Sequence, residues 1–421
     1  MKTNIFLAAK LGFKADKSGK LSGTSRFISV ISVAISVCVI IIAIAVANGF
    51  RYQIADKARG FASDVTLATP GEDITNTVHP INSDLSYLSH IKSLPFVSGI
   101  YGVSYKQGIL KTDDQISGVV IKGVDSTYNL NFFKEHLEQG RVPDFSGRRP
   151  SDEILLSKRL ADMMLYKVGD KVTAYFVGEE IKVRRFTLVG IFNAQLEQLD
   201  KYFALADLRQ VNTLNGWKEA NSGFEVFFEK GSFALSRNDS HLLDRVEQIN
   251  DIMYSYTTEK DSSVSITTLQ DKFYVLADWL HLLDLNVLII LALMILVAGF
   301  NMVSGLLIML FERVSQIGLL KALGMTNKSV SVIFLLGGAW VVLKGMLFGT
   351  LGAVIFCLLQ SKFNFIVLSP DNYFVDSVPI KISAAEIICI DVAAFALIMV
   401  ILVIPCYFIS KVSPANTMRV K

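Results

Sequence analysis

Charged residues are scarce in this chain: they make up 19% of its 421 residues, whereas hydrophobic residues make up 52%. A soluble globular domain carries about 25% charged residues. The balance therefore indicates a membrane protein with a sizeable soluble part. The formal net charge is only +3, and no basic patch is interleaved with aromatic residues. This argues against a protein that binds nucleic acid.

The residue patterns of metal, disulfide and hydrolytic sites are also missing. The four cysteines all lie in apolar runs without a CxxC pair, so the sequence predicts neither a zinc site nor a disulfide framework. The five histidines are scattered, and there is no HExxH and no GxSxG. The phosphate-binding motif GxxxxGK[ST] is absent as well. We therefore expect no enzyme active site, no metal site and no catalytic residue in this chain.

What the chain does have is four long apolar segments. Each reaches the roughly 20 residues that cross a hydrocarbon core of about 30 Å. The first follows a basic segment and lacks a small-residue cleavage site, so we expect a span and not a signal peptide. The second is long enough to project beyond the lipid as a stalk. The predicted spans are 27–49, 281–311, 329–360 and 386–410.

Lysine and arginine gather in three short flanks, which sets the predicted orientation. Residues 1–26 hold six basic residues against one acid, and the segment 312–328 holds three against one. The tail 411–421 has three basic residues and no acid. These flanks are predicted to be cytoplasmic, including both termini. The segment 50–280 and the loop 361–385 then lie outside.

The outer segment 50–280 is predicted to be a folded α+β domain inserted between the first and second transmembrane helices. Strand-like runs alternate with helical stretches along it. The clearest strand-like runs are SGVVIKGV (117–124), KVTAYFVG (171–178), RRFTLVGIF (184–192) and FEVFFEK (224–230). Residues 125–215 have a strand-rich pattern of their own, and we interpret them as an inserted subdomain.

Two charged residues interrupt the later spans. Lys344 sits within the third span, where a charge either marks a transport pathway or reaches the interface or a partner group. We favour the second interpretation. Asp391 lies near the outer end of the fourth span, where it either serves transport or is simply hydrated. Gly345, Gly349 and Gly352 place small residues on adjacent turns, which favours close helix packing in lipid.

The stretch RVSQIGLLKALGMTNKSV, residues 313–330, lies between two spans on the predicted cytoplasmic side. Its apolar residues spread around the helix and leave no continuous polar face, unlike a helix that lies on a membrane. Gly324 is suited to a left-handed C-cap, and Thr326 to the N-cap of the next helix. We expect a short cytoplasmic helix at 312–328 that packs either on a second protein or on its own neighbours.

This stretch resembles the segment after the second span of FtsX-like ABC transporter permeases, with the pattern R-x-x-E-I-G-x-L-(K/R)-A-x-G. In that family the pattern marks the contact with the ATPase. The matching residues are Arg313, Ile317, Gly318, Leu320, Lys321, Ala322 and Gly324, whereas Gln316 replaces the usual glutamate. The resemblance implies the four-span architecture of mechanotransmission (type VII ABC) permeases, and a coupling helix for two copies of a separate ATPase that binds ATP and magnesium.

Further stretches resemble the lipoprotein-releasing (Lol-type) branch of the family. They are residues 27–50, which end in Asn48-Gly49-Phe50, residues 186–217, residues 363–382, and the tail KVSPANTMRV. Gln195 stands where this branch usually has glycine, which predicts a different turn there. The resemblance implies a permease of the bacterial inner membrane that pairs with a second or sister permease. It also implies a lipoprotein cargo and a periplasmic carrier as partners.

Charge-free residues at the outer ends of the first two spans are candidates for a lipid or cargo cleft, although lipid-facing residues have the same character. They are Ile40, Ile44, Ala47, Asn48, Phe50, Leu285, Val287 and Leu288. Two alternatives to lipoprotein release stay open at this point. One is mechanotransmission export of another cargo, such as a macrolide or toxin. The other is a non-transporting FtsX-type regulator of cell-wall hydrolases.

Overall fold

The computed structural model describes residues 20–410, apart from residues 114, 179, 197–199, 230–239, 260, 323, 370–372 and 374. Its account of side chains also leaves out residues 20–26, 302, 305–306, 308–322 and 404–410. The chain forms two units. One is a helical membrane unit, and the other is an outer domain made of residues 51–281 and 368–377.

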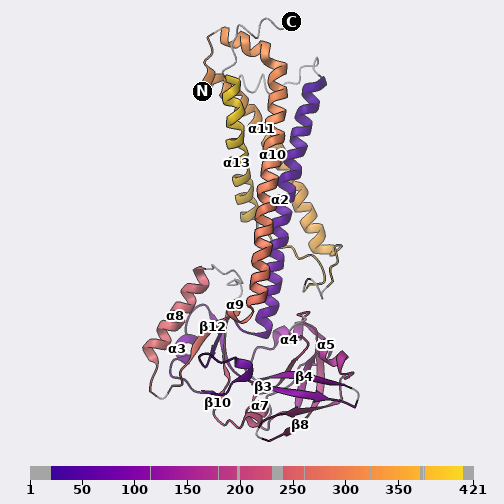
Figure 1. The fold of residues 1–421 in the computed structure, drawn as a ribbon, viewed down its shortest axis with the longest axis vertical. Coiled ribbons are helices and arrows are strands. Elements are labelled where there is room, and N and C mark those ends of the chain that lie inside the picture. Colours follow the sequence, from indigo (N-terminus) through magenta and orange to yellow (C-terminus); the bar gives the residue numbers. More distant parts are fainter. Residues whose placement is uncertain are drawn as a thin grey trace. The chain divides into compact units, whose positions relative to one another are not determined.

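The membrane unit is built from four helices that are long and apolar enough to cross a membrane (Figure 1). They are α2 (Lys20–Phe61), α10 (Tyr274–Ala322), α11 (Asn327–Phe363) and α13 (Ala384–Ser410). An apolar core joins them, with Val33 and Val37 from α2, Ala298 from α10, Met346 from α11 and Ile398 from α13. This confirms the predicted four-helix membrane part with the outer domain between its first two helices.

The third helix packs closely on the first through its glycines. A Cβ atom built on Gly349 would lie 2.5 Å from the carbonyl oxygen of Ala34, and one on Gly345 would lie 2.7 Å from the Cβ of Val33. At Gly352 the nearest atom is the sulfur of Cys38, at 3.8 Å. The structure therefore confirms close packing at Gly345 and Gly349, whereas Gly352 has room for a methyl group.

The two charged residues of the later spans find partners on the bundle. Lys344 is exposed, and its Nζ lies 5.4 Å from the ring centroid of Trp340, within cation–π range. Asp391 accepts a hydrogen bond from the hydroxyl of Thr350, whose oxygen lies 3.0 Å from each carboxylate oxygen. These contacts agree with the interpretation that Lys344 reaches a partner group.

A ten-stranded sheet organises the outer domain. Its order is β12–β1–β11–β3–β4–β9–β6–β8–β5, and β7 pairs with β3 and β8. Among the described strands, the pairs β4–β9 and β6–β8 are parallel and the others antiparallel. The strands are β1 (Val65–Ala68), β3 (Val97–Lys111), β4 (Ile116–Val124), β5 (Leu137–Gly140), β6 (Glu153–Ser157), β7 (Lys171–Phe176), β8 (Lys182–Phe192), β9 (Phe203–Asp207), β11 (Gly223–Phe228) and β12 (Ser265–Thr268). A separate two-stranded sheet pairs β2 (Ile81–Asn82) with β10 (Ala220–Asn221).

Short helices follow many of these strands. They are η1 (Ile74–Asn76), α3 (Leu88–Lys92), α4 (Asn131–Glu135), α5 (Lys158–Met163), α7 (Leu208–Asn215), α8 (Ser240–Tyr256) and α9 (Leu269–Lys272). Side-chain caps begin several of them: the hydroxyl of Ser157 accepts a hydrogen bond from the amide of Leu160 at the start of α5, and Thr268 with Asp271 forms a capping box at the start of α9. Each cap satisfies an amide that the helix leaves unpaired.

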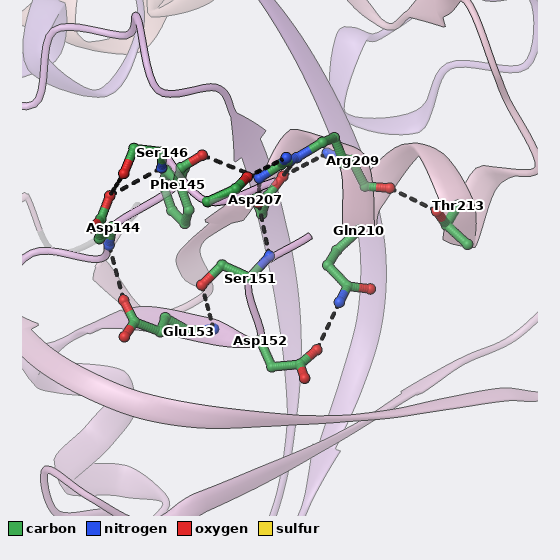
Figure 2. Close-up of polar contacts among 11 residues, drawn as sticks. Asp144, Phe145, Ser146, Ser151, Asp152, Glu153, Asp207, Arg209, Gln210 and Thr213 are labelled. Carbon is green, nitrogen blue, oxygen red and sulfur yellow. Dashed lines mark hydrogen bonds and ion pairs between the residues drawn. The ribbon is translucent and has the colours of Figure 1, made fainter. Parts of the chain in front are cut away.

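The long loop between β5 and β6 is fastened to the start of α7 (Figure 2). The carboxylate of Asp207 accepts the amides of Arg209 and Ser151, both at 2.9 Å. The guanidinium of Arg209 donates to the carbonyls of Phe145 and Gly147, at 3.1 and 2.7 Å. Asp207, the N-cap of α7, and Arg209 in its first turn thus satisfy three backbone groups of a loop that has no regular structure of its own.

The structure differs from the predicted organisation at three places. Residues 125–215 do not form a separate sheet, because their strands β5–β9 join β3 and β4 in the ten-stranded sheet. Residues 368–377 of the 361–385 loop belong to the outer domain. Helix α10 continues without a break to Ala322, so residues 312–322 extend the second span and do not form a separate helix.

Candidate functional site

The C-terminal residue of α2, Phe61, contacts a buried cluster of charged and hydroxyl groups in the outer domain. Lys122 on β4 and Glu225 on β11 have fully buried side chains, and the Lys122 Nζ lies 2.7 Å from Oε2 of Glu225. Strand β3 lies between the two, with Tyr105 opposite Lys122 and Tyr101 opposite Glu225. The period-two alternation of a strand therefore puts both charges on one face of the sheet.

Every donor of the Lys122 ammonium has an acceptor. Besides Glu225, it donates to the hydroxyl of Tyr128 at 2.8 Å and to the carbonyl of Phe61 at 2.9 Å. Phe61 is the last residue of α2, so this cation satisfies a carbonyl that the helix end leaves unpaired and complements the negative end of the helix dipole. The carboxylate of Glu225 also accepts from the hydroxyls of Tyr105 and Tyr128, at 2.9 and 2.8 Å.

The electrostatics favour an ion pair at neutral pH. Burial lowers the pKa of Lys122 to about 8, with the carboxylate of Glu225 acting against it. Burial alone raises the pKa of Glu225, but Lys122, Lys272 and the hydroxyl of Tyr128 together hold it below its usual value. Burial and the nearby carboxylate raise the pKa values of Tyr105 and Tyr128 well above 10, so both remain donors.

A second lysine, Lys272, lies near the same carboxylate, in the segment that leads from the outer domain into α10. Lys272 ends α9, two residues before α10 begins at Tyr274, and its Nζ lies 5.6 Å from the ring centroid of Tyr105. Burial lowers the pKa of Lys272, and the charge of Glu225 acts to raise it. Glu225 therefore attracts cations that adjoin both α2 and α10.

Asp64, three residues after α2, adds a second set of bonds at this place. Its carboxylate accepts from Arg59 Nε at 2.8 Å and from the amide of Phe228 at 2.7 Å. Its carbonyl accepts from the amide of Leu269, the first residue of α9, at 3.0 Å. We call the seven residues at this place the stalk junction: Phe61, Asp64, Tyr105, Lys122, Tyr128, Glu225 and Lys272. It fixes the end of α2 and the start of the α10 connection to the same strands.

A smaller group, which we call the loop clip, consists of Lys57, Gln195 and Asp376. The side-chain oxygen of Gln195 accepts from Lys57 Nζ at 2.6 Å, and its nitrogen donates to the carboxylate of Asp376. Gln195 has a φ of +61°, in the left-handed region that glycine favours. The backbone here has a conformation that glycine favours, and glutamine adds two side-chain bonds, while the expected difference in the turn stays a prediction.

The predicted coupling residues fall largely outside the described side chains. Arg313, Gln316, Ile317, Gly318, Leu320, Lys321 and Ala322 all lie in the helical backbone of α10, and nothing is described of their side chains. Two predictions from this stretch are confirmed. Gly324 has a φ of +89°, as a left-handed cap requires, and the hydroxyl of Thr326 accepts the amide of Ser329 at the start of α11.

The residues of the predicted lipid or cargo cleft have unequal exposure. Ile40 and Phe50 are buried and Ile44, Ala47 and Val287 half-buried, whereas Leu285 and Leu288 are exposed. Asn48 donates to the carboxylate of Glu386 at 3.4 Å, and a Cβ on Gly49 would lie 2.2 Å from the carbonyl oxygen of Pro379. The Asn48-Gly49-Phe50 motif thus packs on the segment before α13. The cleft itself stays a prediction.

Sequence reasoning missed the stalk junction and the loop clip. The junction did leave a signal, because Lys122 and Glu225 each interrupt a strand-like apolar run, SGVVIKGV and FEVFFEK. A lone charge at a position that faces the core needs a partner there. The clip left none, because Gln195 and Asp376 lie 181 positions apart.

Among the described residues, no group of three or more histidine, cysteine, aspartate or glutamate residues is placed to hold a metal ion.

Comparison with known proteins identifies two family models along the chain. The FtsX-like permease C-terminal model matches residues 288–414, and the MacB-like periplasmic core domain model matches residues 27–230. The lipoprotein-releasing system transmembrane protein LolC of Xylella fastidiosa (strain 9a5c) is 21% identical, with 98% of each chain covered. The corresponding LolE of Haemophilus influenzae is 23% identical, with 99% of each chain covered.

Among solved structures, the periplasmic region of MacB from Actinobacillus actinomycetemcomitans is 12% identical, with a TM-score of 0.35 over 52% of this chain and 94% of that chain. FtsX-like permeases are membrane subunits without catalytic activity, and their ATPase is a separate subunit. The protein is accordingly a multi-pass membrane protein with a periplasmic domain. This chain belongs to the FtsX-like ABC transporter permeases and carries a MacB-like periplasmic core domain between its first two transmembrane helices.

Proposed function

We propose that this permease couples ATP hydrolysis by its separate ATPase to the release of lipoproteins from the bacterial inner membrane towards the outer membrane. The observation that carries the proposal is the match to LolC and LolE over nearly the whole length of both chains. It includes the periplasmic domain and all four transmembrane helices. A general exporter and a hydrolase regulator are the alternatives.

The stalk junction supports a mechanism in which helix movement drives the periplasmic domain. Release of a lipoprotein needs work, because each buried methylene of an acyl chain contributes about 0.8 kcal/mol to anchoring. An ATPase on the cytoplasmic side can do this work at the far side only through elements that transmit movement. The end of α2 is hydrogen-bonded to Lys122, and the carboxylate of Glu225 that pairs with Lys122 also attracts Lys272 next to α10, which suits both connections to that task.

The remaining parts of the proposal follow from the sequence and the family. Both termini and residues 312–328 face the cytoplasm, where Arg313–Gly324 contact two ATPase copies that bind ATP and magnesium. A second or sister permease completes the membrane unit. The cargo acyl chains enter between the outer ends of the first two helices, and a periplasmic carrier receives the lipoprotein.

Depletion of the protein in its own host, followed by membrane fractionation, tests the proposal. Outer-membrane lipoproteins should accumulate in the inner membrane within the depletion period, whereas a β-barrel protein of the outer membrane should still reach its destination. Lipoproteins that remain correctly sorted after full depletion would exclude lipoprotein release. Loss of cell-wall hydrolysis in the same cells would then favour the regulator.

A further inference from the structure

A cavity of about 250 Å³ opens beside the last turns of α2 in the outer domain. Its walls come from α2, β3, β11 and the segment 128–135 that includes α4. The lining residues that matter for its chemistry are Asp56, Tyr101, Tyr128, Phe132, Glu135 and Phe227. All of them belong to the outer domain, so the site is complete within that unit.

Three aromatic rings form one side of this cavity. The ring centroids of Tyr101 and Tyr128 lie 5.1 Å apart, and the ring of Phe227 lies 5.8 Å from that of Tyr101 and 6.0 Å from that of Tyr128. The hydroxyl of Tyr128 accepts a hydrogen bond from Lys122 and donates one to Glu225, and these two bonds fix the position of its ring. Aromatic faces carry negative electrostatic potential and attract cations.

Two carboxylates and one guanidinium line the cavity. Asp56 and Glu135 both line it, and Asp125 lies close enough to add to the effect of burial in raising the pKa of Tyr101. Arg59 also lines the cavity: its guanidinium carbon lies 5.8 Å from the ring centroid of Phe227, and the group is paired with Asp64 and donates to the carbonyl of Phe228. The charge of Lys122, behind Tyr128, is balanced by Glu225.

We propose that this cavity binds an organic ammonium group, with its alkyl part against the aromatic rings and its charge towards Asp56 and Glu135. Aromatic faces combined with carboxylates match the requirements of such a cation, which carries a positive charge next to an apolar alkyl part. The bound group contacts α2 and β11 together, so it stabilises the arrangement at the stalk junction. The inference does not depend on which cargo the permease releases.

Titration of the purified full-length protein with choline, followed by isothermal calorimetry, tests the proposal. Choline should bind saturably, and about tenfold more tightly than its uncharged isostere 3,3-dimethylbutan-1-ol, because a tenfold ratio corresponds to about 1.4 kcal/mol and lies within the cation–π range. Equal affinity for the two compounds, or no saturable binding of choline, would overturn the proposal.

Carboxylate variants locate the site. Glu135 is exposed at the end of α4, so Glu135→Gln should leave the fold intact and weaken choline binding about threefold to tenfold, with a larger loss when Asp56→Asn is added. Glu247→Gln on exposed α8 is the matched control and should bind choline like the parent protein. Unchanged affinity in the double variant would show that this cavity is not the site.

A final arm separates two sources of the same chemistry. In nanodiscs, competition from phosphatidylethanolamine but not from phosphatidylglycerol would identify a lipid head group as the natural ammonium. Equal choline binding in both lipids would identify a soluble amine. Either result retains the ammonium site, because both require saturable choline binding that is lost in the carboxylate double variant.

Discussion

The ammonium nitrogen of Lys122 lies 2.7 Å from the carboxylate of Glu225 and 2.9 Å from the carbonyl oxygen of Phe61 at the end of α2. A single side chain therefore connects a strand of the periplasmic domain to the helix that leads to the membrane. Its counter-ion also attracts Lys272, which precedes α10. A movement of either helix consequently acts on the same buried charges, where a displacement of one partner would leave another unpaired.

Loss of the Lys122 cation should destabilise the periplasmic domain strongly. Lys122→Met leaves Glu225 buried without its counter-ion and the carbonyl of Phe61 without its donor. Removal of one partner of a buried pair costs about 3–5 kcal/mol. For a domain of this size, the melting temperature should fall by roughly 6–20 °C. Scanning calorimetry of the purified full-length protein measures the change.

Two further variants test the cause of this loss. Lys111→Met removes an exposed lysine at the end of β3 and should change the melting temperature by no more than about 2 °C. Adding Glu225→Gln to Lys122→Met removes the unpaired charge and should recover part of the stability. If Lys122→Met melted like Lys111→Met, the buried pair would not hold the junction together.

Asp200 should make the protein more stable when its charge is removed. Burial raises the pKa of Asp200 to about 6, from an ordinary value of 3.8, and one of its carboxylate oxygens has no hydrogen-bond partner among the described residues. Between those two pH values the folded state binds more protons than the unfolded state, so this group lowers stability as the pH rises. A shift of roughly two units corresponds to about 3 kcal/mol at neutral pH.

The expected result is a pH-dependent difference between Asp200→Asn and the parent protein. At pH 7.5 the variant should be more stable by about 1–3 kcal/mol, since asparagine can still accept the amide of Leu196 through its carbonyl oxygen. The difference should shrink as the pH falls from 6 towards 4, where the parent carboxyl is protonated. Melting curves across this range measure it, and a constant difference would contradict the assigned pKa.

Two variants of Gln195 separate the effect of its side-chain hydrogen bonds from the effect of its left-handed backbone conformation. Gln195→Gly should remove both bonds to Lys57 and Asp376 but suit the left-handed φ, whereas Gln195→Ala removes the bonds and keeps the strain. We expect faster amide hydrogen exchange at 375–378 in both variants. The glycine variant should be more stable than the alanine variant by about 1 kcal/mol. Exchange at the parent rate in both would show that the clip does not hold this segment.

The sequence predicted what depends on local pattern and missed what depends on long-range pairing. The apolar runs predicted the four helices, and Gly324 and Thr326 predicted the caps between α10 and α11, because such signals reside within a few residues. The bond between Gln195 and Asp376 could not be foreseen, since it joins segments 181 positions apart. The continuous α10 was missed because charged residues after 311 mark where apolar sequence stops, and a helix can continue beyond that point.

Helix packing in the membrane unit should distinguish two glycines of α11. Gly349→Ala places a methyl group 2.5 Å from the backbone oxygen of Ala34, so α2 and α11 must separate, at a cost of about 1–3 kcal/mol. The same substitution at Gly352 meets its nearest atom at 3.8 Å and should be tolerated. Thermal inactivation in detergent compares the two. Equal half-lives would mean that the close approach at Gly349 contributes nothing.

The ATPase contact should depend on the apolar residues of the 313–324 stretch. Leu320→Asp or Gly318→Glu introduces a carboxylate where the family pattern has a small or apolar residue, so we expect loss of the co-purifying ATPase. Carbonate extraction should still show the permease inserted in the membrane. Gln316→Glu restores the residue that the family usually has and should retain the ATPase, which makes it the matched control. Retention of the ATPase by the Leu320→Asp variant would place the contact elsewhere on the cytoplasmic side, because a charge cannot be buried in an interface without a partner.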